Sequence, residues 1–312
     1  MNDSKKSNIC VLLGPTSSGK TSLGLDFCKD FNAEIISADS RQIYKHMDIG
    51  TGKQPINSST IVEKKEKHWL VDNVRIWGYD LITPNDFFSV YDYVTFAREK
   101  IKDIKEENKK PIFIGGTGFY IDVLIGKVKT ANIPPDLDLR AELEKYSLTE
   151  LHRKLKITNP QNYEKVDINN KVRIIRSLEK ALSKKTVSTK RHTPVQKENY
   201  LIIGLTAPRE FLYKKVDHWL DYVWENGLLD EVSKLMESEY RNSPKLNGLV
   251  YKSVISKLKK ELSEEDAKQK AKYDLHAYIR RQETYFKKMP VTEWFDISQD
   301  NYREKLYNRL NG

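Results

Sequence analysis

The sequence predicts an α/β fold: a P-loop core whose parallel sheet has helices on both faces, plus a helical insertion domain. Short β-rich apolar runs alternate with longer helical patterns. A glycine-rich loop follows the first apolar run, and the strand signal disappears between about residues 129 and 197. We therefore expect residues 1–128 and 198–312 to form the core and residues 129–197 to form the insertion.

Six apolar runs have the length and composition of strands. In chain order they are Ile9–Leu13, Glu34–Ala38, Trp69–Val71, Pro111–Gly115, Tyr200–Leu205 and Val291–Phe295. Between the third and fourth strands, residues 86–108 place apolar side chains near helical spacing. We expect a helix there, with Asp86 as its N-cap.

The insertion carries three helical patterns, in residues 133–146, 147–157 and 168–185. After the fifth strand the pattern is helical through Lys288, and Gly227 stands where a helix should end. The second half of the core is therefore predicted to be mostly helical.

Composition bounds the class of protein. The chain has 312 residues, 38% of them hydrophobic and 31% charged, which is typical of a soluble globular protein. No apolar stretch approaches the roughly 20 residues of a membrane helix, and the N-terminus lacks the apolar core of a signal peptide. Two cysteines, Cys10 and Cys28, have neither metal-ligand nor disulfide spacing. We expect a cytoplasmic protein without a membrane partner. Its net charge of +10 suits a polyanionic partner wherever the charge is clustered.

The loop after the first strand, "GPTSSGKT" (14–21), has the pattern G-x-x-x-x-G-K-T. Its glycines let backbone N–H groups point at phosphate oxygens, and the following helix adds its dipole. Lys20 supplies a positive charge, and the Thr21 hydroxyl is a candidate Mg²⁺ ligand. Such loops usually bind nucleoside triphosphates. Those enzymes usually carry a further apolar strand that ends in an aspartate. The candidate for that strand here, "PIFIGGTGFY" (111–120), ends in glycines and a threonine instead. This argues against a standard ATPase.

Asp39 follows the second strand, at the edge where open α/β sheets bind ligands. Ser40 and Gln42 accompany it. An amide beside a carboxylate can read the edge of an adenine, and the carboxylate can accept a proton from an attacking amine. A lone aspartate here is more often a helix cap, so its neighbours carry the functional interpretation.

Five motifs occur in a specific order: "GPTSSGKT" (14–21), "ADSRQIY" (38–44), "MDIGTGK" (47–53), "GGTGFY" (115–120) and "RRQET" (280–284). In this order they resemble the tRNA dimethylallyltransferases of bacterial type, which prenylate the N6 amine of the adenine 3′ of the anticodon. The resemblance extends over nearly the whole chain. It implies that the loop holds the diphosphate of dimethylallyl diphosphate, that the carbon–oxygen bond breaks, and that diphosphate leaves.

The resemblance also implies roles for individual residues. Asp39 would take the proton from the adenine amine, Thr117 would touch the leaving group or the backbone near the base, and Arg140 would neutralise the departing diphosphate. Mg²⁺ would bind at Thr21. The diphosphate would be cradled by Gly14, Thr16, Ser17, Ser18, Gly19, Lys20 and Thr21.

The implied macromolecular partner is the anticodon stem-loop of tRNA. Residues 171–197 contain nine Lys or Arg against one Glu, and "RRQETYFKK" (280–288) is a second basic cluster. Both compositions suit phosphate contacts, although most charge runs are simply solvated helix faces. We expect a monomer. The expected tRNA contacts are Asp39, Ser40, Arg41, Gln42, Arg173, Arg176, Arg280, Arg281 and Gln282.

Three other functions share some of these features. An adenylate isopentenyltransferase acting on free adenine nucleotides would need neither the insertion nor the basic clusters. A small-molecule kinase with the same loop would bind ATP and would give "GGTGFY" (115–120) no role. A non-catalytic RNA-binding protein would have no use for the intact motif residues. The chain departs from the family pattern at Trp69, Trp219, Val250 and Tyr285.

Overall fold

The computed structural model describes residues 9–57, 59–129, 135–182 and 198–311. The chain divides into two compact units, one formed by residues 1–128 with 198–312 and the other by residues 129–197. No helix in the described ranges is long and apolar enough to cross a membrane.

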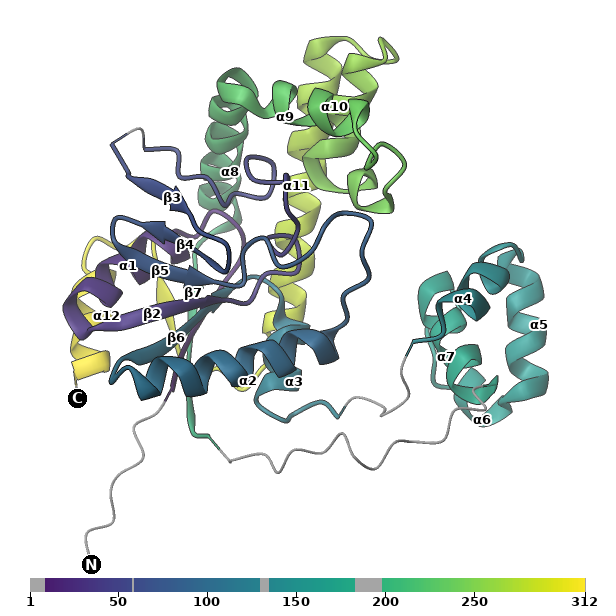
Figure 1. Cartoon of the computed structure of the whole chain (residues 1–312), viewed down its shortest axis with the longest axis horizontal. Helices are drawn as coiled ribbons and strands as arrows, with labels where there is room; N and C mark the ends of the chain where they lie inside the picture. The colour runs from purple at the N-terminus through teal and green to yellow at the C-terminus, as the bar shows by residue number, and fades with distance from the viewer. Residues whose placement is uncertain (1–8, 58, 130–134, 183–197, 312) are drawn as a thin grey trace, which may run out of the picture. The chain divides into compact units, whose positions relative to one another are not determined.

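An eight-stranded sheet forms the centre of the larger unit, in the order β3-β4-β5-β2-β6-β1-β7-β8 (Figure 1). From β5 to β8 all neighbouring strands are parallel. The six predicted strands are all present, so the predicted α/β class is confirmed. The strands are β1 (Ile9–Leu13), β2 (Ala33–Ser37), β3 (Val62–Lys64), β4 (His68–Val71), β5 (Val74–Trp77), β6 (Lys110–Gly115), β7 (Tyr200–Thr206) and β8 (Glu293–Asp296).

The β3–β4–β5 edge of the sheet is antiparallel, which makes the sheet mixed. The apolar-run pattern did not identify β3 or β5. Asp72 and Asn73, with φ of 48° and 65°, connect β4 to β5. Two successive residues at positive φ favour a tight hairpin whose twist matches that of the strands. A hairpin therefore makes this edge antiparallel, whereas the sequence predicted a parallel sheet.

Helices cover both faces of the sheet, as predicted. Val11 and Leu13 of β1 pack into an apolar cluster with helices α2 and α3, whereas Leu12 packs with α1 and α12 on the opposite face. This alternation is the period of two expected for a strand that is buried on both sides. The four helices are α1 (Lys20–Phe31), α2 (Val90–Glu106), α3 (Gly118–Leu124) and α12 (Tyr302–Asn311).

The helix α2 begins later than predicted. Its N-cap is Ser89, whose hydroxyl accepts from the Asp92 N–H while the Asp92 carboxylate accepts from the Ser89 N–H. The prediction of Asp86 as the cap was wrong. The Asp86 carboxylate instead accepts from the N–H and hydroxyl of Thr83. The reciprocal capping box of Ser89 satisfies two groups and therefore outcompetes a single aspartate.

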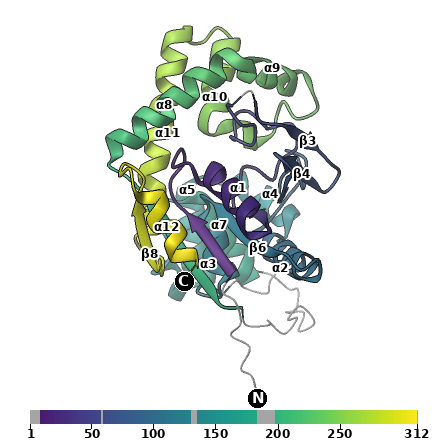
Figure 2. The same cartoon turned by 90° about the vertical axis from the view of Figure 1, so that its left-hand side faces the viewer.

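A helical lobe rises beyond the sheet in both views (Figure 1, Figure 2). Its long last helix, α11, runs from the lobe back to α3 beside the sheet. Gly227, at φ 103°, breaks the helix as predicted. The lobe consists of α8 (Arg209–Val223), the π-helical turn η2 (Trp224–Leu228), α9 (Leu229–Glu237), the 3₁₀ turn η3 (Pro244–Asn247), α10 (Leu249–Leu258) and α11 (Glu264–Phe286).

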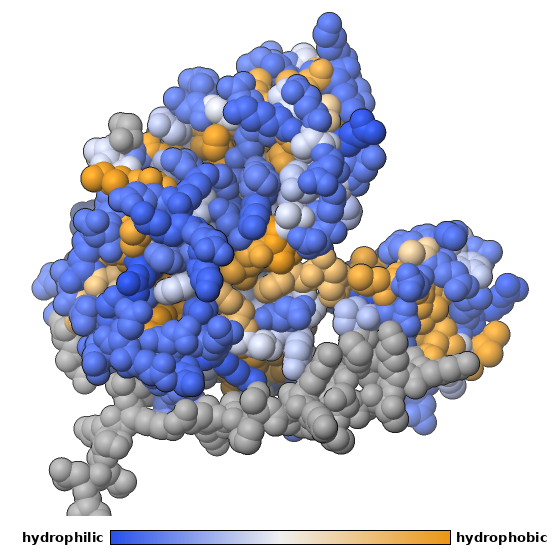
Figure 3. Space-filling model, in the orientation of Figure 1, coloured by the Kyte–Doolittle hydropathy of each residue, from blue (hydrophilic) through white to orange (hydrophobic). Residues whose placement is uncertain are grey.

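The smaller unit has an apolar core of its own, which includes Leu151, Leu155 and Leu178. Its three predicted helices are present, and Figure 3 shows apolar areas on its surface between polar ones. A further helical turn begins at Pro160, next to the capping side chain of Asn159. The end of the basic stretch, residues 183–197, lies outside the described residues. The helices are α4 (Leu137–Glu144), α5 (Leu148–Thr158), α6 (Pro160–Tyr163) and α7 (Lys171–Leu182).

Candidate active site

Three loops meet at the carboxyl edge of the central strands. β2, β6 and β1 are adjacent and parallel, so the segments that follow them lie side by side. These segments are residues 14–19 after β1, residues 38–42 after β2 and residues 115–117 at the end of β6. The fold therefore brings together the phosphate loop, "DSRQ" and "GGTG", as the sequence predicts for a ligand crevice.

The phosphate loop has the backbone geometry of an anion site. Ser17 and Gly19 have φ of 59° and 77°, and a Cβ on Gly14 would lie 2.8 Å from the Leu205 carbonyl oxygen. The following helix, α1, has no capping side chain and no acidic residue in its first turn. Its N-terminal N–H groups and its dipole are therefore available to an anion.

Lys20 follows this loop at the start of α1, and its ammonium forms no ion pair with a described residue. Its ammonium donates to the Pro15 carbonyl at 2.6 Å and to the Ser18 hydroxyl at 3.2 Å. Among the described residues no carboxylate lies within ion-pair distance of it. Burial lowers the pKa of Lys20 to about 8, and the negative charge of Asp39 opposes part of that shift. An ammonium that is desolvated and unpaired is suited to receive an anion.

Asp39 is the carboxylate whose negative charge acts on Lys20. One of its oxygens accepts the Arg41 N–H at 2.9 Å. Burial raises the pKa of the Asp39 carboxyl above its ordinary 3.8, and the Arg41 N–H and the charges of Lys20 and Arg41 oppose the rise. A raised pKa brings a carboxylate closer to the strength that a general base needs near neutral pH.

The loops after β2 and β6 are tied to each other. The Ser40 N–H donates to the Thr117 hydroxyl oxygen at 2.9 Å, and that hydroxyl donates to the Ser40 side chain at 3.2 Å. The Gln42 amide accepts from Ser37 at 2.7 Å and donates to the Thr51 carbonyl at 3.4 Å. Thr117 and Gln42 thus hold the segment that carries Asp39.

Gln282 is buried, whereas a residue predicted to contact RNA would be expected at the surface. It is 5% exposed, on α11. Its side-chain oxygen accepts the Thr16 N–H at 2.8 Å, and its nitrogen donates to the Gly116 carbonyl at 3.0 Å. Gly116 permits this approach, because a Cβ there would lie 2.4 Å from the Gln282 nitrogen. Gly118 is similarly covered by the Tyr285 ring, 2.4 Å from the position of a Cβ.

The three arginines of the larger unit that the sequence predicts as tRNA contacts differ in exposure. Arg280 and Arg281 are exposed on α11, the first bonded to the Tyr213 hydroxyl at 3.1 Å and the second 5.7 Å above the Tyr278 ring. Arg41 is half-buried and donates to the Lys245 carbonyl at 2.8 Å. The exposed pair remains accessible to an RNA phosphate, and their role in tRNA binding stays a prediction.

Arg140 and Arg176 lie in the insertion, where both bind the fully buried carboxylate of Glu179. The Arg140 contacts measure 2.9 Å and 3.0 Å. Arg173 is exposed and lies 3.6 Å from the Asp167 carboxylate. The carboxylate of Glu179 orients two arginines that the sequence predicts for diphosphate and tRNA. Those two roles stay predictions.

Sequence reasoning did not identify Glu231. Its carboxylate accepts the backbone N–H groups of Asp48, Ile49 and Gly50 at 2.7–3.1 Å, and the Tyr251 hydroxyl at 2.8 Å. It therefore fixes the "MDIGTGK" loop from α9. No local pattern could have revealed this contact, because the partners are more than 180 residues apart.

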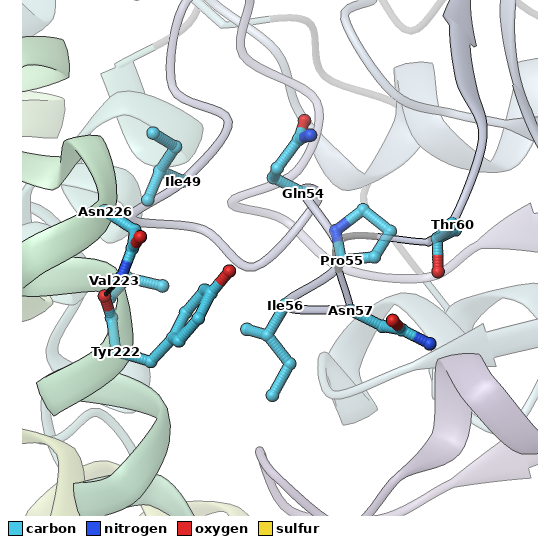
Figure 4. A pocket seen from close by; sticks show the side chains of 9 residues that line it. All are labelled: Ile49, Gln54, Pro55, Ile56, Asn57, Thr60, Tyr222, Val223 and Asn226. Atoms are coloured by element: carbon cyan, nitrogen blue, oxygen red, sulfur yellow. Dashed lines mark hydrogen bonds between the residues drawn. The ribbon is translucent and has the colours of Figure 1, made fainter.

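Two hollows border that loop. Figure 4 shows the smaller, about 210 Å³, between Ile49 and Gln54 on the loop and Tyr222 and Asn226 of the helical lobe. The larger, about 690 Å³, shares some of this lining and continues to Tyr240. Neither is lined by the phosphate-loop lysine or by the candidate base. The candidate chemistry is therefore outside these two hollows.

The departures from the family pattern occupy packing positions. Trp69 is buried and donates to the Asp80 carboxylate at 2.7 Å, and Tyr285 donates to Asp122 at 2.8 Å. Val250 is fully buried, and Trp219 lies beside the Gly52 backbone.

The described residues contain no group of three His, Cys, Asp or Glu that could hold a metal ion. Thr21, half-buried in the first turn of α1, offers a single hydroxyl. One protein oxygen fits Mg²⁺, which keeps most of its ligands as water and substrate phosphate oxygens.

Comparisons with known proteins show which family the chain resembles. A family model described as IPP transferase matches residues 42–289. A tRNA dimethylallyltransferase of Acetivibrio thermocellus is 37% identical over 316 residues, covering 97% of this chain and 96% of the relative. One of Clostridioides difficile is 34% identical over 98% of this chain and 97% of the relative.

Solved structures resemble the chain as well. The crystal structure of the full-length tRNA isopentenylpyrophosphate transferase of Bacillus halodurans is similar with a TM-score of 0.68 and 31% identity. The match covers 98% of this chain and 95% of that one. The α/β fold is thus shared with these transferases over nearly its whole length.

Proposed function

Because the chain belongs to the IPP transferase family, we propose that it transfers a dimethylallyl group from dimethylallyl diphosphate to tRNA. The acceptor is N6 of the adenine 3′ of the anticodon, and the second product is diphosphate. One observation carries the proposal. The same edge of the sheet holds Lys20, a desolvated ammonium without an ion pair among the described residues, and Asp39, a carboxyl group with a raised pKa.

The reaction needs three things from these residues. The N6 lone pair forms a bond to the allylic carbon, and the carbon–oxygen bond breaks with its electron pair leaving on diphosphate. Asp39 accepts the proton that N6 loses. Lys20 and the N–H groups of the phosphate loop stabilise the negative charge that develops on the leaving diphosphate. The loop after β2 thus serves the adenine amine, and the phosphate loop serves the leaving group.

A metal ion and residues of the insertion would supply further positive charge. Thr21 would hold Mg²⁺ against the diphosphate, where the ion would neutralise further charge. Arg140 would supply a cation from the insertion, and Arg173, Arg176, Arg280 and Arg281 would contact tRNA phosphates. The free thiols Cys10 and Cys28 suit a reducing cytoplasm.

The two alternative enzyme functions, a small-molecule kinase and an adenylate isopentenyltransferase, would use different substrates. A kinase would turn over ATP, and an adenylate isopentenyltransferase would prenylate AMP. We favour tRNA because two arginines are exposed on α11, directly beside the helix turn that packs on "GGTG".

The test is a transfer assay with Mg²⁺, dimethylallyl diphosphate and unmodified tRNA, followed by digestion and mass spectrometry of the nucleosides. One prenyl unit on adenosine is expected. Product with AMP and none with tRNA would move the assignment to the nucleotide enzyme. ATP hydrolysis without any prenyl transfer would move it to a kinase.

Asp39→Asn tests the base separately. We expect kcat to fall by about 10²–10⁴-fold, the range of general-base catalysis, while tRNA affinity changes little. In the wild type, kcat/KM falls as protonation removes the base, with a midpoint above the ordinary pKa of 3.8 because burial raises it. This acid limb should be absent from the residual activity of the variant. A lost affinity with turnover preserved would refute the assignment.

A further inference from the structure

Gln282 is the one side chain of α11 that hydrogen-bonds, within the described residues, to both the phosphate loop and the "GGTG" loop. It comes from the far end of the chain, 266 residues after Thr16 and 166 after Gly116. The phosphate loop would hold the leaving group, while Gly116 lies against Asp39, whose carboxylate oxygen is 3.3 Å from the position of a Gly116 Cβ. One amide therefore spans the two halves of the reaction.

The amide has the chemistry that this span requires. A backbone N–H needs an acceptor and a backbone carbonyl needs a donor, and only one orientation of the Gln282 amide satisfies both. Because the side chain is buried, a lost partner would leave a polar group without water. Neither a shorter amide nor an ionised carboxylate of the same length can make both contacts.

The helix holds this amide firmly. Ile279, one turn earlier, is fully buried in the apolar cluster on one face of the sheet. Phe286, one turn later, is buried in the cluster on the other face. Gln282 thus projects from a segment of α11 that is anchored on both sides, and it can act as a fixed spacer.

We propose that Gln282 is a positioning residue: it sets the separation of the phosphate loop from the loop against Asp39, so that leaving group and base are held in register. The inference rests on the proposed function and deepens it. It also gives Gln282 a role different from the RNA contact expected from the sequence. The contact occupies the Thr16 N–H, so this donor is withheld from the diphosphate while the spacer is in place.

Two variants test the proposal in the full-length protein. Gln282→Met keeps the length but removes both hydrogen bonds. We expect kcat to fall about 10- to 100-fold, since small misplacements of reacting groups cost up to about 10²-fold. The dissociation constant for tRNA should stay within about twofold, because an interior spacer does not touch RNA.

Gln282→Glu provides a readout that a merely structural role would not move. Burial raises the pKa of a carboxyl group, and the protonated form both accepts and donates as the amide does. The ratio of variant to wild-type kcat should therefore rise as pH falls from 8 to 6. Taking the ratio at each pH removes the titration of Asp39, which is common to both proteins.

Leu275→Val is the matched control. It trims a buried side chain on the same helix, two turns before Gln282, and it should lower the melting temperature slightly with kinetics unchanged. A flat pH ratio for Gln282→Glu, or a loss of tRNA affinity with kcat preserved, would overturn the proposal. Failure of the proposed function is distinguishable, because the wild type itself would then transfer no prenyl group.

Discussion

Two loops of the core look alike in sequence and differ in use. Each has a glycine in the left-handed region followed by a lysine: Gly19–Lys20 in "SSGKT" and Gly52–Lys53 in "GTGKQ". The glycines have φ of 77° and 69°. Both lysines turn their ammonium groups toward the protein, so the local pattern alone does not separate them.

Their partners do. The ammonium of Lys53, which is 2% exposed, pairs with Asp48 at 2.5 Å and with Asp80, and it also donates to a carbonyl. Asp80 in turn accepts from Trp69 at 2.7 Å. Among the described residues, the Lys20 ammonium donates to a carbonyl and a hydroxyl and forms no ion pair. A buried charge with its counter-charges holds the fold together, whereas a desolvated charge without one is poised for a ligand.

The largest expected effect follows from the satisfied lysine. Lys53→Met removes the buried ammonium that pairs with Asp48 and Asp80, whose side chains are 14% and 21% exposed. Breaking a buried ion pair in this way costs about 3–5 kcal/mol of unfolding free energy. Urea unfolding measures it. Adding Asp80→Asn should recover part of the loss, because Asp48 keeps its pair with Lys64 whereas Asp80 has lost its cation.

Lys20→Met is the matched comparison for stability. Its ammonium has no carboxylate partner among the described residues, so removing it should leave the unfolding free energy unchanged or higher. If both methionine variants destabilised the protein equally, the distinction between a structural and a ligand-binding lysine would fail.

The second effect is on catalysis and concerns the unsatisfied lysine. Lys20→Met removes a preorganised cation from the proposed leaving group, which typically costs about 10²–10³-fold in kcat. Because the Lys20 charge also lowers the pKa of Asp39, the acid limb of the residual activity should move to higher pH. Steady-state kinetics over pH 5–9 measure both. An acid limb that does not move would show that the two groups are not coupled in the working enzyme.

Much of the fold could be predicted because its signals are local. All six apolar runs became strands. Four of them, β1, β2, β6 and β7, are central parallel strands, which are apolar because both of their faces are buried. β3 was missed because it is short and its residues are half-buried or exposed. Asp86 was chosen over Ser89 because single-residue preference does not show that Asp92 would reciprocate.

The candidate site divides in the same way. Lys20, Asp39 and Thr117 follow strands directly, so sequence order and parallel pairing place them together. The contacts of Gln282 and Glu231 join segments that are 166 to 266 residues apart. No periodicity records such long-range pairs, and only the packing of α9 and α11 against the loops reveals them.

The smallest expected effect is a titration. Burial lowers the pKa of Lys20 to about 8, so the unliganded ammonium loses its proton above that pH. Its desolvation cost to stability is fully present below about pH 8 and disappears as pH rises toward the unfolded value of 10.5. A bound diphosphate favours the charged form and raises the pKa, so affinity must fall as pH rises above 8. The fall should be up to about tenfold per pH unit, about 1.4 kcal/mol.

Calorimetric titration with dimethylallyl diphosphate and Mg²⁺ at pH 7–9.5 measures this fall in affinity. Lys20→Arg, which stays charged throughout, should remove the lysine's share of the slope. An equally steep fall in that variant would place the titrating group on the ligand and leave Lys20 charged over the whole range.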